Sequence, residues 1–218
     1  MKQFITILAL GIAASAAGSP SGPARSASLE NLRIKGILMY DNDKNVENFG
    51  LYEYTVTPEV TRRMLTPIRA VSANGGSVAV DNKLYTFQYD IQYGYVNSAR
   101  YYVYDLTTGE QLSSTSMGYD VATVYSHAAV SSAVDPVSGT VYSSGYEYNE
   151  ADKTLTVKLK TWDLANSTKT TVGSMQAPLI AMAFDKDGQL WGITASSSTT
   201  STDGGFLIKV DKATGAMT

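Results

Sequence analysis

The chain has no cysteine, a single histidine and few charged residues. Asp, Glu, Lys and Arg together make up 17% of its 218 residues, and the formal net charge is −3. Without cysteine the chain can form neither disulfides nor a thiolate nucleophile, and zinc sites with cysteine ligands are excluded. Because no run of Lys and Arg occurs, a nucleic acid is not an expected partner.

Long apolar runs are also missing, except at the N-terminus. Lys2 precedes the apolar stretch Phe4–Ala14, and the small residues Ala14-Ser15-Ala16 follow it, as in a cleavable export signal. The stretch is too short for a permanent transmembrane anchor, although a membrane-anchored N-terminus is the alternative. We predict a signal peptide over residues 1–17 and a flexible polar tether over residues 18–31. The protein is then exported, to the periplasm, the cell surface or the medium, and the absence of disulfides fits a bacterium.

Tyrosine and glycine are abundant instead, with 15 and 18 residues. Tyr, Val and Thr favour strands and Gly marks turns, so this composition indicates a β-rich chain. Helical spacing is absent over any useful length, and Glu59–Met64 is expected to form a single helical turn at most. The sequence therefore predicts an all-β protein.

A pattern of about fifty residues recurs three times between Gly76 and the C-terminus. Each copy opens with a small or apolar run that ends in Asp, and an aromatic residue follows after a short turn. Roughly twenty residues later comes a second Asp, again at a turn. The opening aspartates are Asp81, Asp135 and Asp185, the aromatic residues are Tyr85, Tyr142 and Trp191, and the second aspartates are Asp105, Asp163 and Asp211. Periods of this length indicate supersecondary units that bury their faces only against their neighbours.

Each copy predicts three or four antiparallel strands joined by hairpins. A degenerate earlier copy lacks the innermost strand and its signature. In the second unit, the polar pair Asn97-Ser98 predicts a break between strands, and the last unit stops at Thr218, where a fourth strand should begin. The repeat region spans residues 32–218, with units at about residues 32–68, 74–117, 127–174 and 178–218.

The run of apolar residues, Asp, turn and aromatic residue, with a later aromatic-Asp-x-x-Thr-Gly, resembles β-propeller repeat proteins of the quinoprotein-like or seven-bladed beta-strand-repeat kind. The resemblance covers about 185 of the 218 residues. It implies a β-propeller-like fold with about three and a half to four antiparallel four-stranded blades around a channel. This number of blades corresponds either to a small four-bladed ring or to an incomplete ring. We predict an incomplete ring, with the missing C-terminal blades in a longer parent chain.

Few residues point to a reaction. His127 lies just upstream of an expected inner strand, near the channel mouth, where it would be a metal ligand, a general base or a solvated polar side chain. Arg69 and Arg100 are the other residues to test for catalysis. No second histidine shares a metal and no nucleophile motif occurs. We therefore predict no catalytic set, no metal site and no cofactor.

The repeated aspartates and tyrosines have structural explanations. Asp at a hairpin turn accepts backbone N–H bonds, and one active site does not need a copy in every blade. The aromatic residues between Tyr85 and Tyr104 either fill the spaces between blades or present rings to a sugar or a protein. Alternation sends Tyr101 and Tyr102 to opposite faces. In the second interpretation, Tyr93 and Tyr102 are candidate ligand-binding residues, together with His127, Arg69 and Arg100.

The sequence favours a non-enzymatic, exported scaffold that binds a protein or a surface glycan. A propeller enzyme, such as a hydrolase or lyase with its site at the channel mouth, is the second hypothesis, because propellers collect site residues from scattered loops. A structural spacer on the cell surface is the third.

Overall fold

The structure is a computed structural model that describes residues 33–38, 48–55, 60–68, 74–92, 95–118, 129–194 and 205–218. The predicted signal peptide and tether lie outside these residues. None of the described residues belongs to a helix with the length and apolar character that crossing a bilayer requires. Fourteen strands account for most of the described chain, so the predicted all-β class is confirmed.

The strands form four antiparallel sheets, in each of which strands that follow one another in sequence are neighbours. Sheet 1 consists of β1 (Arg33–Leu38), β2 (Gly50–Thr55) and β3 (Thr61–Pro67). Sheet 2 consists of β4 (Asn74–Val80), β5 (Lys83–Gln92), β6 (Tyr95–Asp105) and β7 (Gln111–Gly118). Sheet 3 consists of β8 (Ala129–Val134), β9 (Val141–Asn149), β10 (Thr154–Asp163) and β11 (Thr168–Ser174). Sheet 4 consists of β12 (Leu179–Phe184), β13 (Leu190–Thr194) and β14 (Leu207–Val210).

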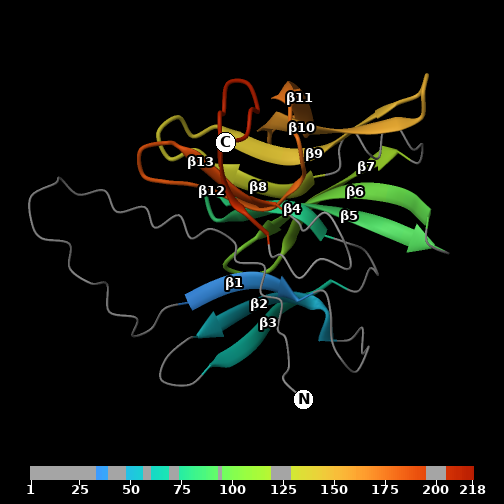
Figure 1. Cartoon of the computed structure of the whole chain (residues 1–218). Helices are drawn as coiled ribbons and strands as arrows, with labels where there is room; N and C mark the ends of the chain where they lie inside the picture. The colour runs from blue at the N-terminus through green and yellow to red at the C-terminus, as the bar shows by residue number, and fades with distance from the viewer. Residues whose placement is uncertain are drawn as a thin grey trace, which may run out of the picture.

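The four sheets follow one another like the segments of a fan (Figure 1). The first strands of sheets 2, 3 and 4, namely β4, β8 and β12, lie side by side at the centre. The last strands of sheets 2 and 3, β7 and β11, form the opposite edge of each sheet. This arrangement is β-propeller-like, as the repeat predicts, and the ring is not closed.

Sheet 1 corresponds to the three outer strands of a unit. The turn that ends β6 lies against β3, because a Cβ added at Gly109 would be 2.7 Å from the carbonyl carbon of Leu65. The turn after β14 lies in the same way against β11, since a Cβ at Gly215 would be 3.1 Å from the Ser174 oxygen. β3 therefore has the outermost position that β11 has in sheet 3. Among the described residues, sheet 1 consists of these three strands alone, and the missing inner strand stays a prediction.

Alternation gives each sheet two faces, and the core lies between the sheets. We call the face toward the next sheet the front and the face toward the preceding sheet the back. Between sheets 1 and 2 the buried residues are Leu51, Ile68, Leu84, Tyr104 and Leu106. Between sheets 2 and 3 they are Val78, Phe87, Ala99, Tyr101, Val103, Val141 and Trp162. Between sheets 3 and 4 they are Leu159, Met175, Leu179, Leu190 and Val210.

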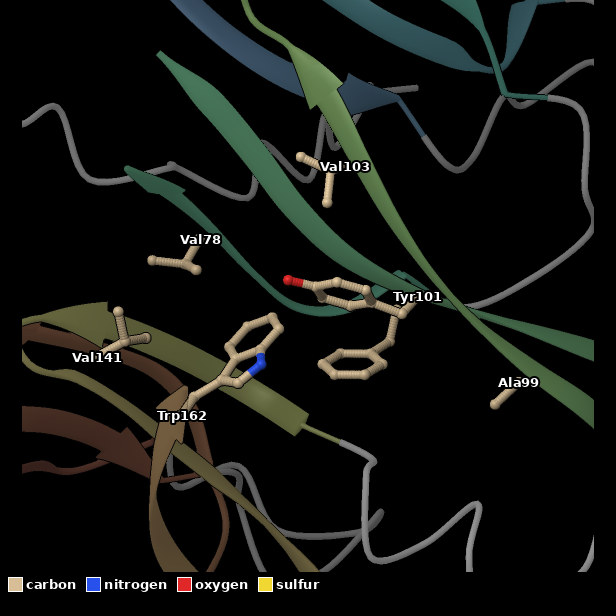
Figure 2. Close-up of a cluster of buried hydrophobic side chains, with 7 residues drawn as sticks. Val78, Ala99, Tyr101, Val103, Val141 and Trp162 are labelled. Carbon is tan, nitrogen blue, oxygen red and sulfur yellow. The ribbon is translucent and has the colours of Figure 1, made fainter. Parts of the chain in front are cut away.

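Trp162 of β10 joins sheets 2 and 3 (Figure 2). Its ring centroid lies 4.8 Å from that of Phe87, nearly stacked, and 5.8 Å from that of Tyr101, edge to face. The Tyr101 hydroxyl donates a hydrogen bond of 3.1 Å to the Leu164 carbonyl of sheet 3. For these rings, the interpretation that aromatic residues fill the space between units is confirmed.

The expectation of a helical turn at Glu59–Met64 was wrong for the described part of that segment. Thr61–Pro67 forms β3, in which Met64 pairs with Tyr52 of β2. The Arg63 guanidinium also contacts the Glu53 carboxylate at 3.2 Å. Pairing with a neighbouring strand, which local spacing does not reveal, decides the conformation here.

The break expected at Asn97-Ser98 is not in the structure either. β6 runs through both residues from Tyr95 to Asp105. The irregularity lies in the pairing of β5 with β6, whose register shifts between Asp90 and Ile91. A bulge of this kind absorbs one extra residue without ending a strand, so the polar pair remains within the hairpin.

Beyond β14, the chain turns back and makes one isolated bridge with that strand. Met217 forms a bridge with Val210. Lys209 and Thr218 exchange two backbone hydrogen bonds of 2.9 Å. These contacts lie where the sequence predicts that a fourth strand begins, and that strand stays a prediction.

Gly109 and Gly139 form a matched pair for testing how sheet 1 is attached. Each N–H donates a 2.8 Å bond to the carbonyl of an Asp, Asp105 or Asp135, that begins the same kind of turn. Both have a positive φ, of 78° and 72°. A Cβ would meet the Leu65 backbone at Gly109 but nothing within 4 Å at Gly139.

We expect Gly139→Ala to lower the free energy of unfolding by about 1–2 kcal/mol, the cost of a left-handed alanine. Gly109→Ala should cost about 1–3 kcal/mol more, because its methyl group forces the backbones of β3 and the turn apart. Urea unfolding of the two variants measures the difference. Equal losses would show that this turn does not hold sheet 1 against sheet 2.

Candidate functional site

The second aspartates of the repeat build their own turns. Asp105 accepts N–H bonds from Thr107 at 2.7 Å and Thr108 at 2.9 Å. Asp163 and Asp211 accept in the same way from the N–H groups two residues later, at 2.9 and 2.8 Å. Backbone donors lower the pKa of Asp105 and Asp211, and the Asn166 side chain does so for Asp163. The prediction that these aspartates are structural is confirmed.

The opening aspartates differ from one another. Asp81 and its neighbour Asn82 take left-handed φ values of 48° and 60° in the two-residue turn from β4 to β5. This is the backbone that a tight hairpin prefers. Asp185 accepts N–H bonds from Asp187 at 3.0 Å and Gln189 at 2.9 Å. It also accepts a 3.1 Å bond from the Trp191 indole nitrogen.

Asp135 is the centre of a buried ionic contact between sheets 3 and 4. Its carboxylate is fully buried and accepts bonds from the Val137 N–H and the Ser138 hydroxyl, both 2.9 Å. The Lys212 amine, which belongs to the turn after β14, donates to it at 2.6 Å. Burial alone would raise the pKa of Asp135, but Lys212 and the other donors outweigh it and lower the pKa to about 2. Asp135 is therefore ionised at neutral pH and suits a scaffold rather than acid or base catalysis.

Within the described ranges, no three His, Asp or Glu side chains are grouped so that they could hold a metal ion. Five of the six repeat aspartates have carboxylates that already accept backbone or side-chain donors, which indicates a structural role: Asp105, Asp135, Asp163, Asp185 and Asp211.

Sequence reasoning missed two lysines packed between sheets 2 and 3. Lys160 is 3% exposed, and its amine donates a 2.7 Å bond to the Tyr146 carbonyl. The Lys169 amine lies 4.1 Å from the Phe87 ring centroid and 4.6 Å from that of Trp162. Burial lowers the pKa of both lysines, and the nearby Lys160 lowers that of Lys169 further. The signal in the sequence was that Lys160 and Trp162 are two residues apart. In a strand this spacing places both side chains on one face.

Two of the predicted site residues lie on the same strand. Arg100 and Tyr102 are both on β6. Arg100 is exposed and pairs with Gln88 of β5. Tyr102 is half-buried against the cluster between sheets 1 and 2, and its ring stacks on Tyr104 at 5.9 Å. The structure thus brings these two residues together on the back of sheet 2.

The other predicted site residues, His127, Arg69 and Tyr93, lie outside the described residues. Their roles as ligand-binding or catalytic groups stay predictions.

Sheet 4 presents apolar side chains on its front face, the face turned away from sheet 3. Cross-strand pairing places Ala181 beside Ile193, and Ile193 beside Leu207. Ile193 is 39% exposed and Leu207 is 70% exposed. The front face of sheet 4 is formed by Ala181 and Ala183 of β12, Trp191 and Ile193 of β13, and Leu207 and Lys209 of β14.

In the other repeats, these positions are buried. Ile193 lies two residues after the aromatic residue of its repeat, and Leu207 lies four residues before the second Asp. The counterparts in sheets 2 and 3 are Phe87 (0% exposed) and Ser144 (0%) for Ile193, and Tyr101 (3%) and Leu159 (0%) for Leu207. The front face of sheet 4 therefore has the composition of a contact surface between sheets.

The ion pair at Asp135 makes a prediction about acid stability. Asp135→Asn should lower the free energy of unfolding near neutral pH by about 1–3 kcal/mol. The hydrogen bonds from Lys212 and from the turn would then reach a neutral amide instead of a charged carboxylate. The folded protein keeps Asp135 ionised down to a pKa of about 2, below the ordinary value of 3.8. Because the folded pKa is the lower one, this contribution is complete above about pH 4 and is lost as the pH falls toward about 2.

Urea unfolding at several pH values between about 7 and 2 measures the difference between the native protein and the variant. The difference should shrink below about pH 4. Asp187→Asn is the control, because Asp187 is 75% exposed in its contact with Lys186. A difference for Asp135→Asn that stays constant across this range would contradict the assignment.

Comparison with known proteins finds no family model that matches the chain, and no curated protein matches it. Among solved structures, the chain is similar to TolB from Acinetobacter baumannii, with 12% identity and a TM-score of 0.48 over 85% of this chain and 40% of that one. It is also similar to a gluconolactonase from Xanthomonas campestris, with 9% identity and a TM-score of 0.48 over 85% and 56% of the two chains. The β-propeller domain of the Trilobed protease from Pyrococcus furiosus gives 7% identity and a TM-score of 0.32 over 65% and 41%. The chain thus spans 40% to 56% of the length of these three chains. At this level of similarity, the activities of those proteins are not transferred to this chain.

Proposed function

We propose that the protein is an exported, non-enzymatic propeller scaffold that binds another protein through the front face of sheet 4. The observation that carries this proposal is the exposure of Ile193 and Leu207, at 39% and 70%, at positions that sheets 2 and 3 bury. Contiguous apolar surface on a folded protein marks a contact site. Covering it would contribute about 25 cal/mol for each Å² of apolar surface removed from water.

The front face of sheet 4 is supported from behind by packed side chains. Behind Ile193 and Leu207, the back of sheet 4 packs on sheet 3 through Leu190 and Val210, both 0% exposed. The Trp191 ring is held by the bond from its indole nitrogen to Asp185. Little side-chain or backbone freedom would be lost on binding, which favours affinity.

A protein fits this face better than a surface glycan does. The exposed side chains are mainly alanine, isoleucine and leucine, and Lys209 is the one charged residue among the six that form the face. The Trp191 indole nitrogen already has an acceptor in Asp185. A sugar needs several polar partners beside an aromatic ring, whereas an apolar centre is what protein contacts use.

Site-specific photo-cross-linking tests the proposal in the cells that produce the protein. Ile193 is replaced by the photoreactive amino acid benzoylphenylalanine, and irradiation should yield an adduct with a second protein chain. Leu112 is the matched control, because it is 46% exposed on β7, the outer strand of sheet 2. The same replacement there should give no such adduct.

Equal yields at positions 193 and 112, or none at either, would refute the proposal. An adduct whose added mass is removed by a glycosidase would show a glycan in place of the protein.

A further inference from the structure

We propose that sheet 1 carries a second binding site, in which a basic surface at one end of the sheet binds an acidic segment of another protein. The basic surface consists of Arg33 and Lys35 of β1 and Arg62 and Arg63 of β3. It is separate from the front face of sheet 4, so this site and the proposed function do not depend on each other.

Positive charge is concentrated in sheet 1. Its described residues include the four cations of the basic surface and one carboxylate, Glu53, so this sheet has a net charge of +3. The whole chain has a formal net charge of −3. A separation of charge of this kind attracts anionic groups to one part of the molecule and raises their rate of encounter with it.

Strand pairing brings these charges to the same end of the sheet. Lys35 pairs with Glu53, and Glu53 pairs with Arg63. Arg33 lies two residues before Lys35, which places its side chain on the same face. At this end β1 begins, β2 ends and β3 begins, and the arrowhead of β2 marks it (Figure 1). The basic surface is therefore assembled by pairing and does not appear as a run in the sequence.

Glu53 holds two of the guanidinium groups in place. Its side chain is 12% exposed, and its carboxylate accepts bonds from Arg33 at 3.4 Å and from Arg63 at 3.2 Å. The Arg33 and Arg63 side chains remain 64% and 65% exposed. Because a guanidinium has five N–H donors, each keeps donors for a second carboxylate. On the other face, Arg62 is exposed as well.

The kind of partner follows from the neighbours of the basic surface. Val60 directly precedes β3 at this end and is 73% exposed. An apolar side chain beside guanidinium groups suits a partner that carries apolar as well as acidic side chains, as a polypeptide does. A polysaccharide of acidic sugars offers carboxylates without apolar side chains.

A membrane of anionic lipids fits this end less well, because sheet 2 presents acidic groups beside it. The backbone N–H groups of its own turn lower the pKa of Asp105 most, and the charge of Lys35 lowers it further, so the two side chains are neighbours. Glu110 follows in the same turn and is exposed. A flat anionic surface would meet these carboxylates too and be repelled, whereas one extended segment meets sheet 1 alone.

Fluorescence anisotropy of a labelled peptide tests the site on the native full-length protein. The probe is a short peptide of glutamate and leucine, and the control peptide has glutamine in place of glutamate. The acidic peptide should bind with a dissociation constant on the order of 100 µM at low salt, because exposed ion pairs are individually weak. The control peptide should not bind. Raising the salt from about 50 to about 300 mM should weaken binding at least about threefold.

Three variants and a control locate the binding. Arg33→Gln and Arg63→Gln should each weaken it by about two- to fivefold. Lys186→Gln should leave it unchanged, because it removes the same charge from an 87% exposed lysine of sheet 4. Glu53→Gln should strengthen it by about two- to fivefold, since both guanidinium groups lose their internal carboxylate. Loss of the fold does not explain a gain of affinity.

Competition identifies the class of partner. Vesicles containing phosphatidylglycerol, and polygalacturonate, should each displace the peptide less effectively than unlabelled peptide does at the same concentration of anionic groups. Equal or better displacement by either would overturn the choice of a protein segment. Equal weakening by Lys186→Gln, or no binding of the acidic peptide at low salt, would remove the site itself. The adduct at position 193 tests the proposed function separately, whatever this outcome.

Discussion

The fold depends on the packing of the front of one sheet against the back of the next. Each of the three buried clusters contains residues from two sheets. The contact of Trp162 with Phe87, at 4.8 Å, shows why this packing controls the rest. Neither ring would be buried without the other, because an antiparallel sheet that stands alone has no partner for its apolar face. Stability therefore resides between the repeats, as expected for repeat proteins.

Polar turns add specific contacts to this packing, and they vary more than the strands do. Asp105 and Asp135 open the same kind of turn. Asp105 accepts hydrogen bonds from its own turn, whereas Asp135 also accepts one from Lys212 of the next sheet. The difference comes from Lys212, which follows the second Asp of the last repeat, where Leu106 and Leu164 stand in the other copies. Leu106 is buried between sheets 1 and 2. One position in the repeat thus serves either an apolar or an ionic contact between sheets.

The sequence predicts well what local chemistry decides. The predicted run that ends at Asp135 coincides with β8, Ala129–Val134, because its apolar residues and the Asp turn agree about its limits. β3 escaped notice because its conformation comes from pairing with β2, and Arg62-Arg63 interrupts its alternation. Lys160 escaped because lysine is usually exposed, and its burial follows from the neighbouring sheet. For the candidate site, the placement of Arg100 and Tyr102 on β6 follows from the repeat, whereas their roles and those of His127, Arg69 and Tyr93 depend on a ligand.

For the front face of sheet 4 as well, the sequence predicts some properties and not others. Its alternation is visible in the sequence, but its exposure depends on which sheets stand beside it. In stacked repeats, a terminal unit needs a polar outer face to remain soluble. Sheet 4 instead keeps Ile193 and Leu207 at the positions where sheets 2 and 3 have Phe87, Tyr101 and Leu159. A capping unit would carry charged or hydroxyl side chains there, and Lys209 alone does not change the character of the face. By composition, the front of sheet 4 matches the faces that sheets 2 and 3 bury against their neighbours.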